Sequence, residues 1–347
     1  MRGAGALLLL VLIAGCGSSS VAAVPTLSPS MQPSPTAGAG LKPALGGLLD
    51  RDGPPPTGYA AVMGGFVVNV FWADIQPEPN GAIRANNAID QAVTTLRSLD
   101  TSGRMGLKVR LFAGIHAPEW AKSLGGAPIS ITDPVTGASG TVGRFWSPEF
   151  GAAYSDLMTK LSAKYDSVPA VREITISRCT TAYAEPFIRD AANSVAVSNL
   201  LAAGFTVAAD KQCHQDEVIA HEVWAHTRSD LSFNPYQVID GSARSDERYT
   251  EAMMDFCRAT LGQRCVLANN SLRVPLQFPQ MYDHIHALGP PIAFQTAVMA
   301  KVGDLAGTID TAIGLGAASV ELPAGFESLS TNALGTFNNS LAAQAAS

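Results

Sequence analysis

The sequence contains 347 residues, of which 47% are hydrophobic, and its net charge is −6. The apolar fraction suffices for a large buried core, and the length is compatible with one large domain. A negative charge without a Lys/Arg cluster argues against nucleic-acid binding and against a polybasic membrane surface.

The N-terminus has the features of an export signal. Arg2 is followed by the apolar run AGALLLLVLIA and then by Gly15 and Cys16. A run of about a dozen residues is too short to span a hydrocarbon core, which needs about 20. Residues 12–16 resemble the bacterial lipobox, which implies cleavage before Cys16 and a lipid on its sulfur. An ordinary secretory signal that happens to contain a cysteine is the alternative.

Three segments with different properties follow from this interpretation. Residues 1–15 form the lipoprotein signal peptide. Residues 16–40 are rich in Ser, Pro, Gly and Ala and carry no charge, which is typical of a disordered tether. Neither a second linker nor a repeat divides residues 41–347, so we expect one monomeric domain outside the cytoplasm, anchored to the membrane through lipid alone.

Four cysteines remain once Cys16 is assigned to lipid. An even number outside the cytoplasm favours disulfides, although four cysteines allow three connectivities. Proximity in the sequence favours Cys179 with Cys213 and Cys257 with Cys265. Buried free thiols are the alternative.

Apolar runs of strand length alternate with helical stretches along the domain. The strands are expected at 66–72, 107–115, 171–177, 264–269, 291–297 and 317–323, with 43–50 and 204–209 as candidates for a first and a fifth strand. Repeated βα units predict an α/β fold, a (β/α)8 TIM barrel, with a doubly wound open sheet as the alternative.

Polar and aromatic residues gather where these strands end, the end at which barrel enzymes place their chemistry. The candidates are Trp72, Asp74, His116, Trp120, Tyr183, Glu185, Asn269, Gln295 and Glu321.

The segments FWADIQPEPNG, GLKVRLFAGIHAPEW and the stretch 145–177 resemble clan A glycoside hydrolases. Trp72, Trp120 and Glu185 match residues of that family, and Glu185 matches the general acid at the end of strand four. Ala184 stands where the family has asparagine, and Gln76 where glutamate is common.

This resemblance implies cleavage of O-glycosidic bonds, which needs one protonated carboxyl and one carboxylate across the sugar. Glu185 suits the first role. The family's nucleophile ends strand seven, where this chain has Gln295, and an amide cannot replace it. Glu321 is the nearest substitute, and Asp74 could act as a base in an inverting scheme. An ion-paired structural role is the alternative for both glutamates.

The remaining candidates are expected to bind the sugar. Tryptophans offer flat apolar surface to sugar C–H faces, and Asn, Gln and His hydrogen-bond hydroxyl groups. Trp72 and Trp120 could instead be core aromatics.

No metal or cofactor is expected. His221 and His226 are five residues apart, so they are not the i, i+4 pair that binds zinc on a helix, and a polar helix face explains the stretch 214–226 better.

Three functions remain open. The first is a lipid-anchored glycoside hydrolase acting on a poly- or oligosaccharide. The second is a related barrel that binds carbohydrate without cleaving it, and the third is a structural or partner-binding lipoprotein.

Overall fold

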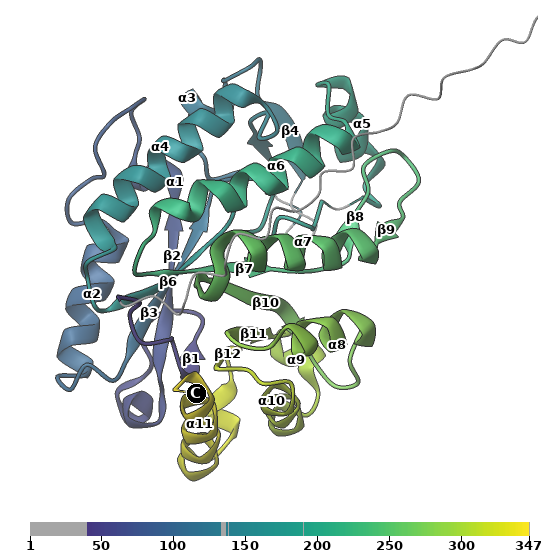
Figure 1. Ribbon diagram of the computed structural model, residues 1–347. Helices are drawn as coiled ribbons and strands as arrows, with labels where there is room; N and C mark the ends of the chain where they lie inside the picture. The colour runs from purple at the N-terminus through teal and green to yellow at the C-terminus, as the bar shows by residue number, and fades with distance from the viewer. Residues whose placement is uncertain (1–39, 133–136, 138, 190, 347) are drawn as a thin grey trace, which may run out of the picture. The chain divides into compact units, whose positions relative to one another are not determined.

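The computed structural model describes residues 40–132, 137, 139–189 and 191–346. Eight parallel strands close into a barrel in the order β1, β2, β3, β6, β7, β10, β11, β12, and β1 pairs with β12 to close it (Figure 1). Their bounds are Gly47–Asp50, Gly65–Phe71, Gly106–Phe112, Val171–Thr175, Arg228–Ser232, Cys265–Leu272, Ile292–Thr296 and Ser319–Leu322. The predicted TIM barrel is confirmed, and the open sheet is wrong.

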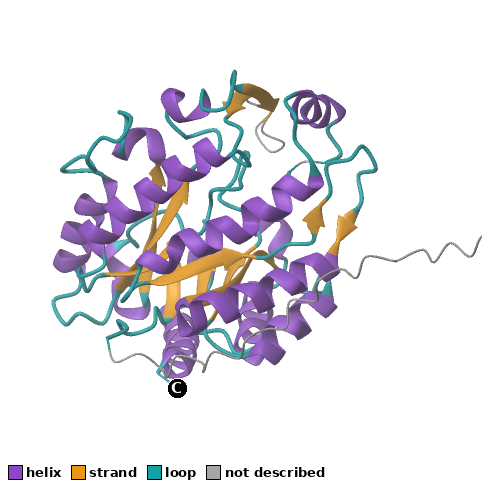
Figure 2. Cartoon of the chain, turned by 45° about the horizontal axis from the view of Figure 1, so that its top comes forward, coloured by secondary structure: helices purple, strands orange, loops and turns teal. Residues whose placement is uncertain are grey.

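Helices surround the barrel, with strands innermost (Figure 2). They are α1 Trp72–Ile75, α2 Ala88–Leu99, α3 Glu119–Lys122, α4 Pro148–Tyr165, α5 Ser194–Ala202, α6 Val207–Ala220, α7 Glu247–Leu261, α8 Pro279–Leu288, α9 Met299–Val302, α10 Leu305–Gly314 and α11 Thr331–Ala345. Two short antiparallel pairs lie outside the barrel: β4 Ile129–Thr132 with β5 Ser139–Val142, and β8 Tyr236–Gln237 with β9 Ser245–Asp246. None of the helices in the described part of the chain is long and apolar enough to cross a membrane.

Local sequence explains where the helices begin. The Asn87 side chain accepts hydrogen bonds from the backbone N–H groups of Ile89 and Asp90 and so caps α2. Ser147 caps α4 in the same way, with Pro148 in the first turn. The buried positions of α2 recur at helical spacing and pack on the barrel.

The first strand lies within the predicted range 43–50, but the predicted fifth strand is wrong. Residues 204–209 lead into α6, where Thr206 caps the helix through the Ala209 N–H group. The fifth strand is β7, whose sequence RSDLS contains a single large apolar residue. Its polar side chains are buried because the barrel interior itself is charged.

Charged side chains fill the middle of the barrel instead of the usual branched apolar residues. Lys108 lies within 2.8 Å of both Asp230 and Glu321, and Arg110 also pairs with Glu321. Alternate residues of a strand point to the same face, so Lys108 and Arg110 both point inward from β3. A smaller apolar cluster of Val266, Ala268 and Ala293 completes the interior.

The seam between β1 and β2 is short. These strands are paired at only two positions, Leu49 with Gly65 and Asp50 with Phe66, whereas β2 and β3 are paired along the whole of β2. A side chain at Gly65 would collide with the Gly106 carbonyl oxygen, which explains the glycine in this strand. The pairing of β1 with β2 ends at Asp50 and Phe66, and farther along β2 the residues Asn69 and Phe71 are exposed.

Candidate active site

The candidate site lies at the carboxyl ends of the barrel strands. Glu185 is in the loop after β6 and is half-buried. Its Oε2 accepts a hydrogen bond from Asn234 Nδ2 at 2.8 Å. Burial raises the pKa of Glu185 above its ordinary 4.5, and the Glu321 charge also raises it. Hydrogen bonds from Asn234 and Asn270 and the charge of Arg110 oppose this shift without cancelling it.

Glu321 has the opposite electrostatic character. It points into the barrel from β12 and is 1% exposed. Burial alone would raise its pKa, but the charges of Arg110 and Lys108, with hydrogen bonds from both, lower the pKa of Glu321 below 4.5. Glu321 therefore remains ionised at neutral pH, whereas Glu185 holds its proton more tightly than an ordinary glutamate.

Arg110 links the two carboxyl groups. Besides its ion pair with Glu321, it donates a hydrogen bond to Gln295 Oε1 at 2.7 Å, and its charge acts on Glu185. Gln295 in turn donates to the Asn270 carbonyl oxygen at 3.2 Å. We did not predict Arg110 from the sequence. The signal for it was the LKVRLF pattern, in which two basic residues alternate with the apolar residues of a buried strand.

Asn269 was predicted to face the barrel mouth, but in the structure it does not. It is 1% exposed, donates to Asn234 Oδ1 at 3.0 Å, and accepts from the Tyr282 hydroxyl at 2.7 Å. Successive strand residues point to opposite faces, so Asn269 points toward α8, whereas the next residue, Asn270, reaches Glu185. Asn269 therefore orients Asn234 and has no surface for a ligand.

Trp72 is also a core residue, contrary to the prediction that it stacks on a sugar. Its side chain is fully buried, with its ring edge-to-face against Trp120 and Phe150. The indole N–H donates to Gln76 Oε1 at 2.9 Å, and Gln76 Nε2 donates to Asp156 at 2.9 Å. An amide at position 76 satisfies both partners because it can accept and donate at once.

Trp120 and a second group of aromatic rings are more accessible. Trp120 is half-buried. The rings of Phe71 and His116 are stacked with centroids 3.9 Å apart, and Phe112 packs edge-on against both. Phe71 is 36% exposed. Sequence reasoning identified His116 but missed Phe71, although it precedes Trp72 at the end of the strand.

Two further predicted residues lie around the mouth. Asp74 is exposed on α1. Tyr183 is half-buried and lines a small hollow with Thr181 and Ile188. This hollow shares Ile131 and other residues with a cavity of about 440 Å³ between α5 and the β4–β5 pair. Apolar side chains and hydroxyl or amide side chains both line that cavity.

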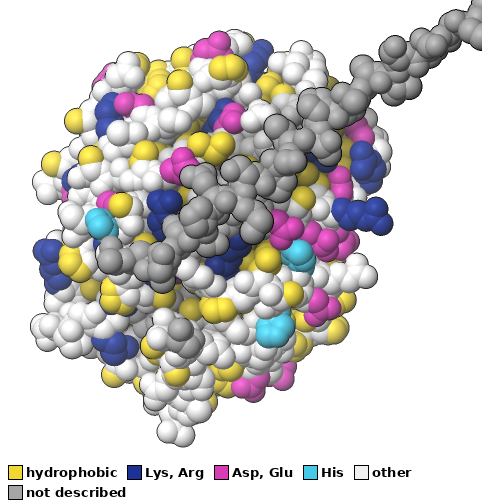
Figure 3. Space-filling model, in the orientation of Figure 1, with side chains coloured by type: hydrophobic (Ala, Val, Ile, Leu, Met, Phe, Trp, Pro, Cys, Tyr) yellow, Lys and Arg dark blue, Asp and Glu magenta, His cyan; other side chains and the backbone are white. Residues whose placement is uncertain are grey.

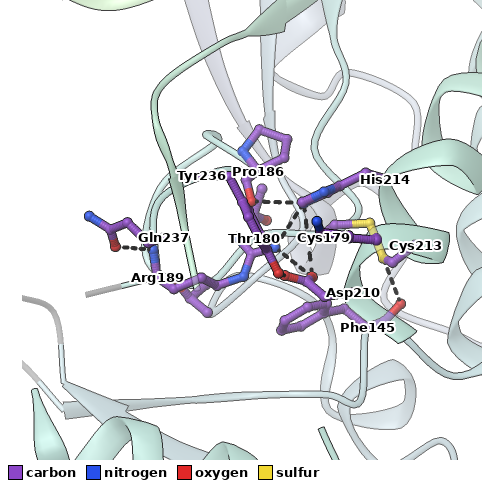
Figure 4. A network of polar contacts seen from close by, with 12 residues as sticks. Phe145, Cys179, Thr180, Pro186, Arg189, Asp210, Cys213, His214, Tyr236 and Gln237 are labelled. Carbon is purple, nitrogen blue, oxygen red and sulfur yellow. Dashed lines mark hydrogen bonds and ion pairs between the residues drawn. A yellow bond between two sulfur atoms is a disulfide. The ribbon is translucent and has the colours of Figure 1, made fainter. Parts of the chain in front are cut away.

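The loop that carries Glu185 is fixed on α6 (Figure 4). The Cys179–Cys213 disulfide joins them, as predicted, and the Cys257–Cys265 disulfide is confirmed as well. His214 Nε2 lies 3.1 Å from the Pro186 carbonyl oxygen, which can only accept. Burial lowers the pKa of His214 to about 4, so the imidazole is neutral.

A fully buried ion pair strengthens this attachment. Arg189 and Asp210 lie 2.9 Å apart, and the Tyr236 hydroxyl donates to the same carboxylate at 2.9 Å. The polar residues of α6 therefore hold the loop that carries Glu185. The helix is polar on this face, as predicted, but the face is buried. Across the described residues, His, Cys, Asp and Glu side chains form no group of three that could hold a metal ion.

Several solved structures are similar to this chain. The catalytic domain of β-amylase from Paenibacillus polymyxa is 11% identical, with a TM-score of 0.50 over 85% of this chain and 94% of that chain. An endo-β-1,4-glucanase from Xanthomonas axonopodis pv. citri is 11% identical, with a TM-score of 0.48 over 86% and 94%. Morphinone reductase is 13% identical, with a TM-score of 0.46 over 80% and 82%.

No protein-family model matches the sequence, and no curated protein matches it. At these identities the likeness concerns the fold: the chain has the closed parallel barrel that the β-amylase domain also has.

Proposed function

We propose that this protein is a glycoside hydrolase that cleaves O-glycosidic bonds of a poly- or oligosaccharide, with Glu185 as general acid/base. The observation that carries the proposal is the different surroundings of two carboxyl groups: Glu185, at the carboxyl ends of the strands, accepts a hydrogen bond from Asn234, whereas Glu321, inside the barrel, is ion-paired with Lys108 and Arg110. These surroundings shift the pKa of Glu185 upward and the pKa of Glu321 downward. Environments that separate the pKa values of two acids assign one as proton donor and the other as carboxylate.

The chemistry follows from this assignment. Glu185 donates its proton to the leaving glycosidic oxygen, and the ionised Glu321 supports the positive charge that develops on the sugar, as nucleophile or as base for water. Arg110 keeps Glu321 ionised and holds Gln295 beside it. Asn234 orients the acid through its hydrogen bond.

The sugar contacts are part of the same proposal. His116, stacked on Phe71, offers an aromatic face at the ends of strands β2 and β3. Further contacts come from four residues near the mouth. The rings of Trp120 and Tyr183 offer apolar surface, and Asp74 and Gln295 offer polar groups for the hydroxyl groups of the sugar.

A second function, carbohydrate binding without cleavage, is favoured by the enclosure of Glu321. Its side chain is almost fully buried, and its two oxygens pair with Lys108 and Arg110. A nucleophile must reach the sugar, so such a carboxylate could be purely structural. A glycan array followed by a reducing-end assay on each ligand found distinguishes the two functions. New reducing ends support the hydrolase, and ligands that bind but stay intact support the binding protein.

We further propose that the chain is exported and anchored by lipid on Cys16. The two disulfides support an oxidising compartment. Cys16 and the predicted signal peptide and tether lie outside the described residues, apart from Gly40. A palmitate analogue should label the wild-type protein in cells and leave Cys16→Ser unlabelled. If the unlabelled variant still partitions wholly into membranes, lipid is not the anchor.

A further inference from the structure

A second cavity lies at the opposite end of the barrel from Glu185. It has a volume of about 920 Å³ and is lined by residues at the amino ends of the strands and by α11. Four basic residues line it: Lys42, Arg104, Arg172 and Arg228. The face in Figure 3 shows basic and acidic side chains interspersed, so a hollow lined by four cations departs from the mixed pattern seen there.

The four basic side chains donate hydrogen bonds to uncharged oxygen atoms. Lys42 donates to two backbone carbonyl oxygens and to the Thr227 hydroxyl. Arg172 donates to the Gly103 carbonyl at 2.7 Å, and Arg228 to the Lys42 carbonyl at 2.8 Å. Arg104 likewise donates only to backbone carbonyls. Among residues 40–346, as far as they are described, no carboxylate lies within ion-pair distance of these four side chains.

Among the described residues, the nearest carboxyl groups offset part of the cavity's positive charge without pairing with any of the four cations. Asp166 acts on Lys42 from a distance, but its oxygens accept the backbone N–H groups of residues 225–227. Asp100 accepts the Met105 and Ser102 N–H groups. Burial raises the pKa of Glu173, the acid that acts on both Arg172 and Arg228, to about 8, so it is largely uncharged at neutral pH.

Two of the guanidinium groups have unused donors. The Nε atoms of Arg172 and Arg228 are buried without a hydrogen-bond partner, and Arg172 is 7% exposed. Keeping a charged group away from water without an anion is costly. An anion in the cavity would offset part of that cost through its charge, and the guanidinium groups that line the cavity are suited to oxyanions.

We propose that this cavity binds a phosphate group. Several converging cations favour a doubly charged tetrahedral oxyanion over a single carboxylate, and the volume accommodates a phosphate ester as well as the free ion. The preceding segment cannot supply the charge, since no acidic residue stands between Met1 and Lys42. A soluble phosphate monoester and a phospholipid headgroup both present phosphate oxygens to these side chains, although the headgroup, a phosphodiester, carries one negative charge and the monoester up to two.

Two variants test the site, so that the result does not depend on a single replacement that could also disturb the fold. Arg228→Gln removes one cation, and its control is Arg248→Gln, an exposed arginine outside the cavity. Asn339→Glu places a carboxylate among the arginines from an exposed position of α11, and its control is Asn332→Glu, an exposed position of the same helix that does not line the cavity. All are made in the full-length chain carrying Cys16→Ser, so that no acyl chain mediates binding.

Two probes are then compared at low ionic strength: inorganic phosphate by titration calorimetry, and vesicles of phosphatidylglycerol against phosphatidylcholine by co-sedimentation. Saturable binding of either anionic probe should weaken about tenfold or more in Arg228→Gln and Asn339→Glu and stay unchanged in the controls. Binding of phosphate identifies a soluble ligand, and binding of phosphatidylglycerol vesicles alone identifies a headgroup. No binding of either probe, or binding that Asn339→Glu leaves intact, would overturn the proposal.

Discussion

Glu185 owes its raised pKa to a balance that one neighbouring residue controls. Burial raises the pKa, and the hydrogen bond from Asn234 lowers it by stabilising the ionised form. The replacement Asn234→Leu removes this hydrogen bond and keeps the site apolar, so the pKa of Glu185 should rise further. The alkaline limb of the kcat/KM profile should move to higher pH. A ¹³C NMR titration of the Glu185 carboxyl should likewise give a higher pKa than in the wild type. A shift to lower pH would contradict this account of Glu185.

Sequence reasoning at the residue scale succeeded where chemistry and position in a strand agreed. Glu185 lies in the loop after β6, a strand that was expected at 171–177 and is observed at Val171–Thr175. Trp72 and Asn269 were wrongly assigned to ligand contact because a residue at a strand end can point toward the helices as easily as toward the axis. Strand register decides this, and register depends on pairing with distant strands.

At the scale of elements, the barrel interior holds three carboxyl groups around two cations. Glu173, Asp230 and Glu321 face Lys108 and Arg110, and burial raises the pKa of both Glu173 and Asp230. Burial is the largest cause of the raised pKa of Glu173, about 8, and the neighbouring charges of Asp230 and Glu321 also raise it.

This proton makes stability depend on pH. Because the folded-state pKa of Glu173 lies above its ordinary 4.5, its contribution is fully present below that value and is lost as pH rises through about 8. The free energy of unfolding of the wild type, relative to Glu173→Gln, should therefore fall between about pH 5 and 8. Urea denaturation across this range measures the difference. A constant difference would show that Glu173 is ionised throughout.

The two disulfides are expected to contribute differently to the free energy of unfolding, because they close loops of different length. Cys179 and Cys213 are 34 residues apart, whereas Cys257 and Cys265 are 8 residues apart. Loop-closure entropy predicts a loss of about 4 kcal/mol without the first disulfide and about 2 to 3 kcal/mol without the second. Denaturant unfolding of the two double Cys→Ser variants tests the order, and a larger loss for the shorter loop would contradict it. The first variant should also lose activity, because its disulfide fixes the loop of Glu185.

Elements with apolar strands and amphipathic helices were predictable, and the fifth strand was not. Its sequence RSDLS has one large apolar residue, whereas β2 and β3 have several, and Asp230 in the middle of the strand pairs with Lys108 inside the barrel. Only the closed barrel brings these charges together, so no local pattern of hydrophobicity could indicate that strand.

At the scale of the whole molecule, the barrel has two chemically different ends. The carboxyl end carries Glu185, whereas the amino end carries a cavity lined by four basic residues. The division follows the general property of such barrels that residues after the strands form active sites. Changes at the amino end, such as Asn339→Glu, should therefore leave glycan cleavage intact.

The central claim is that Glu185 donates a proton to a glycosidic oxygen, and the replacement Glu185→Gln tests it most directly. The two side chains have the same shape, so the variant should bind a cleavable glycan with nearly the wild-type Kd but lose turnover by about a hundredfold or more. Glu78→Gln, an exposed glutamate in the loop after β2, is the matched control and should keep its kcat. A kcat for Glu185→Gln equal to that of the wild type would contradict the account.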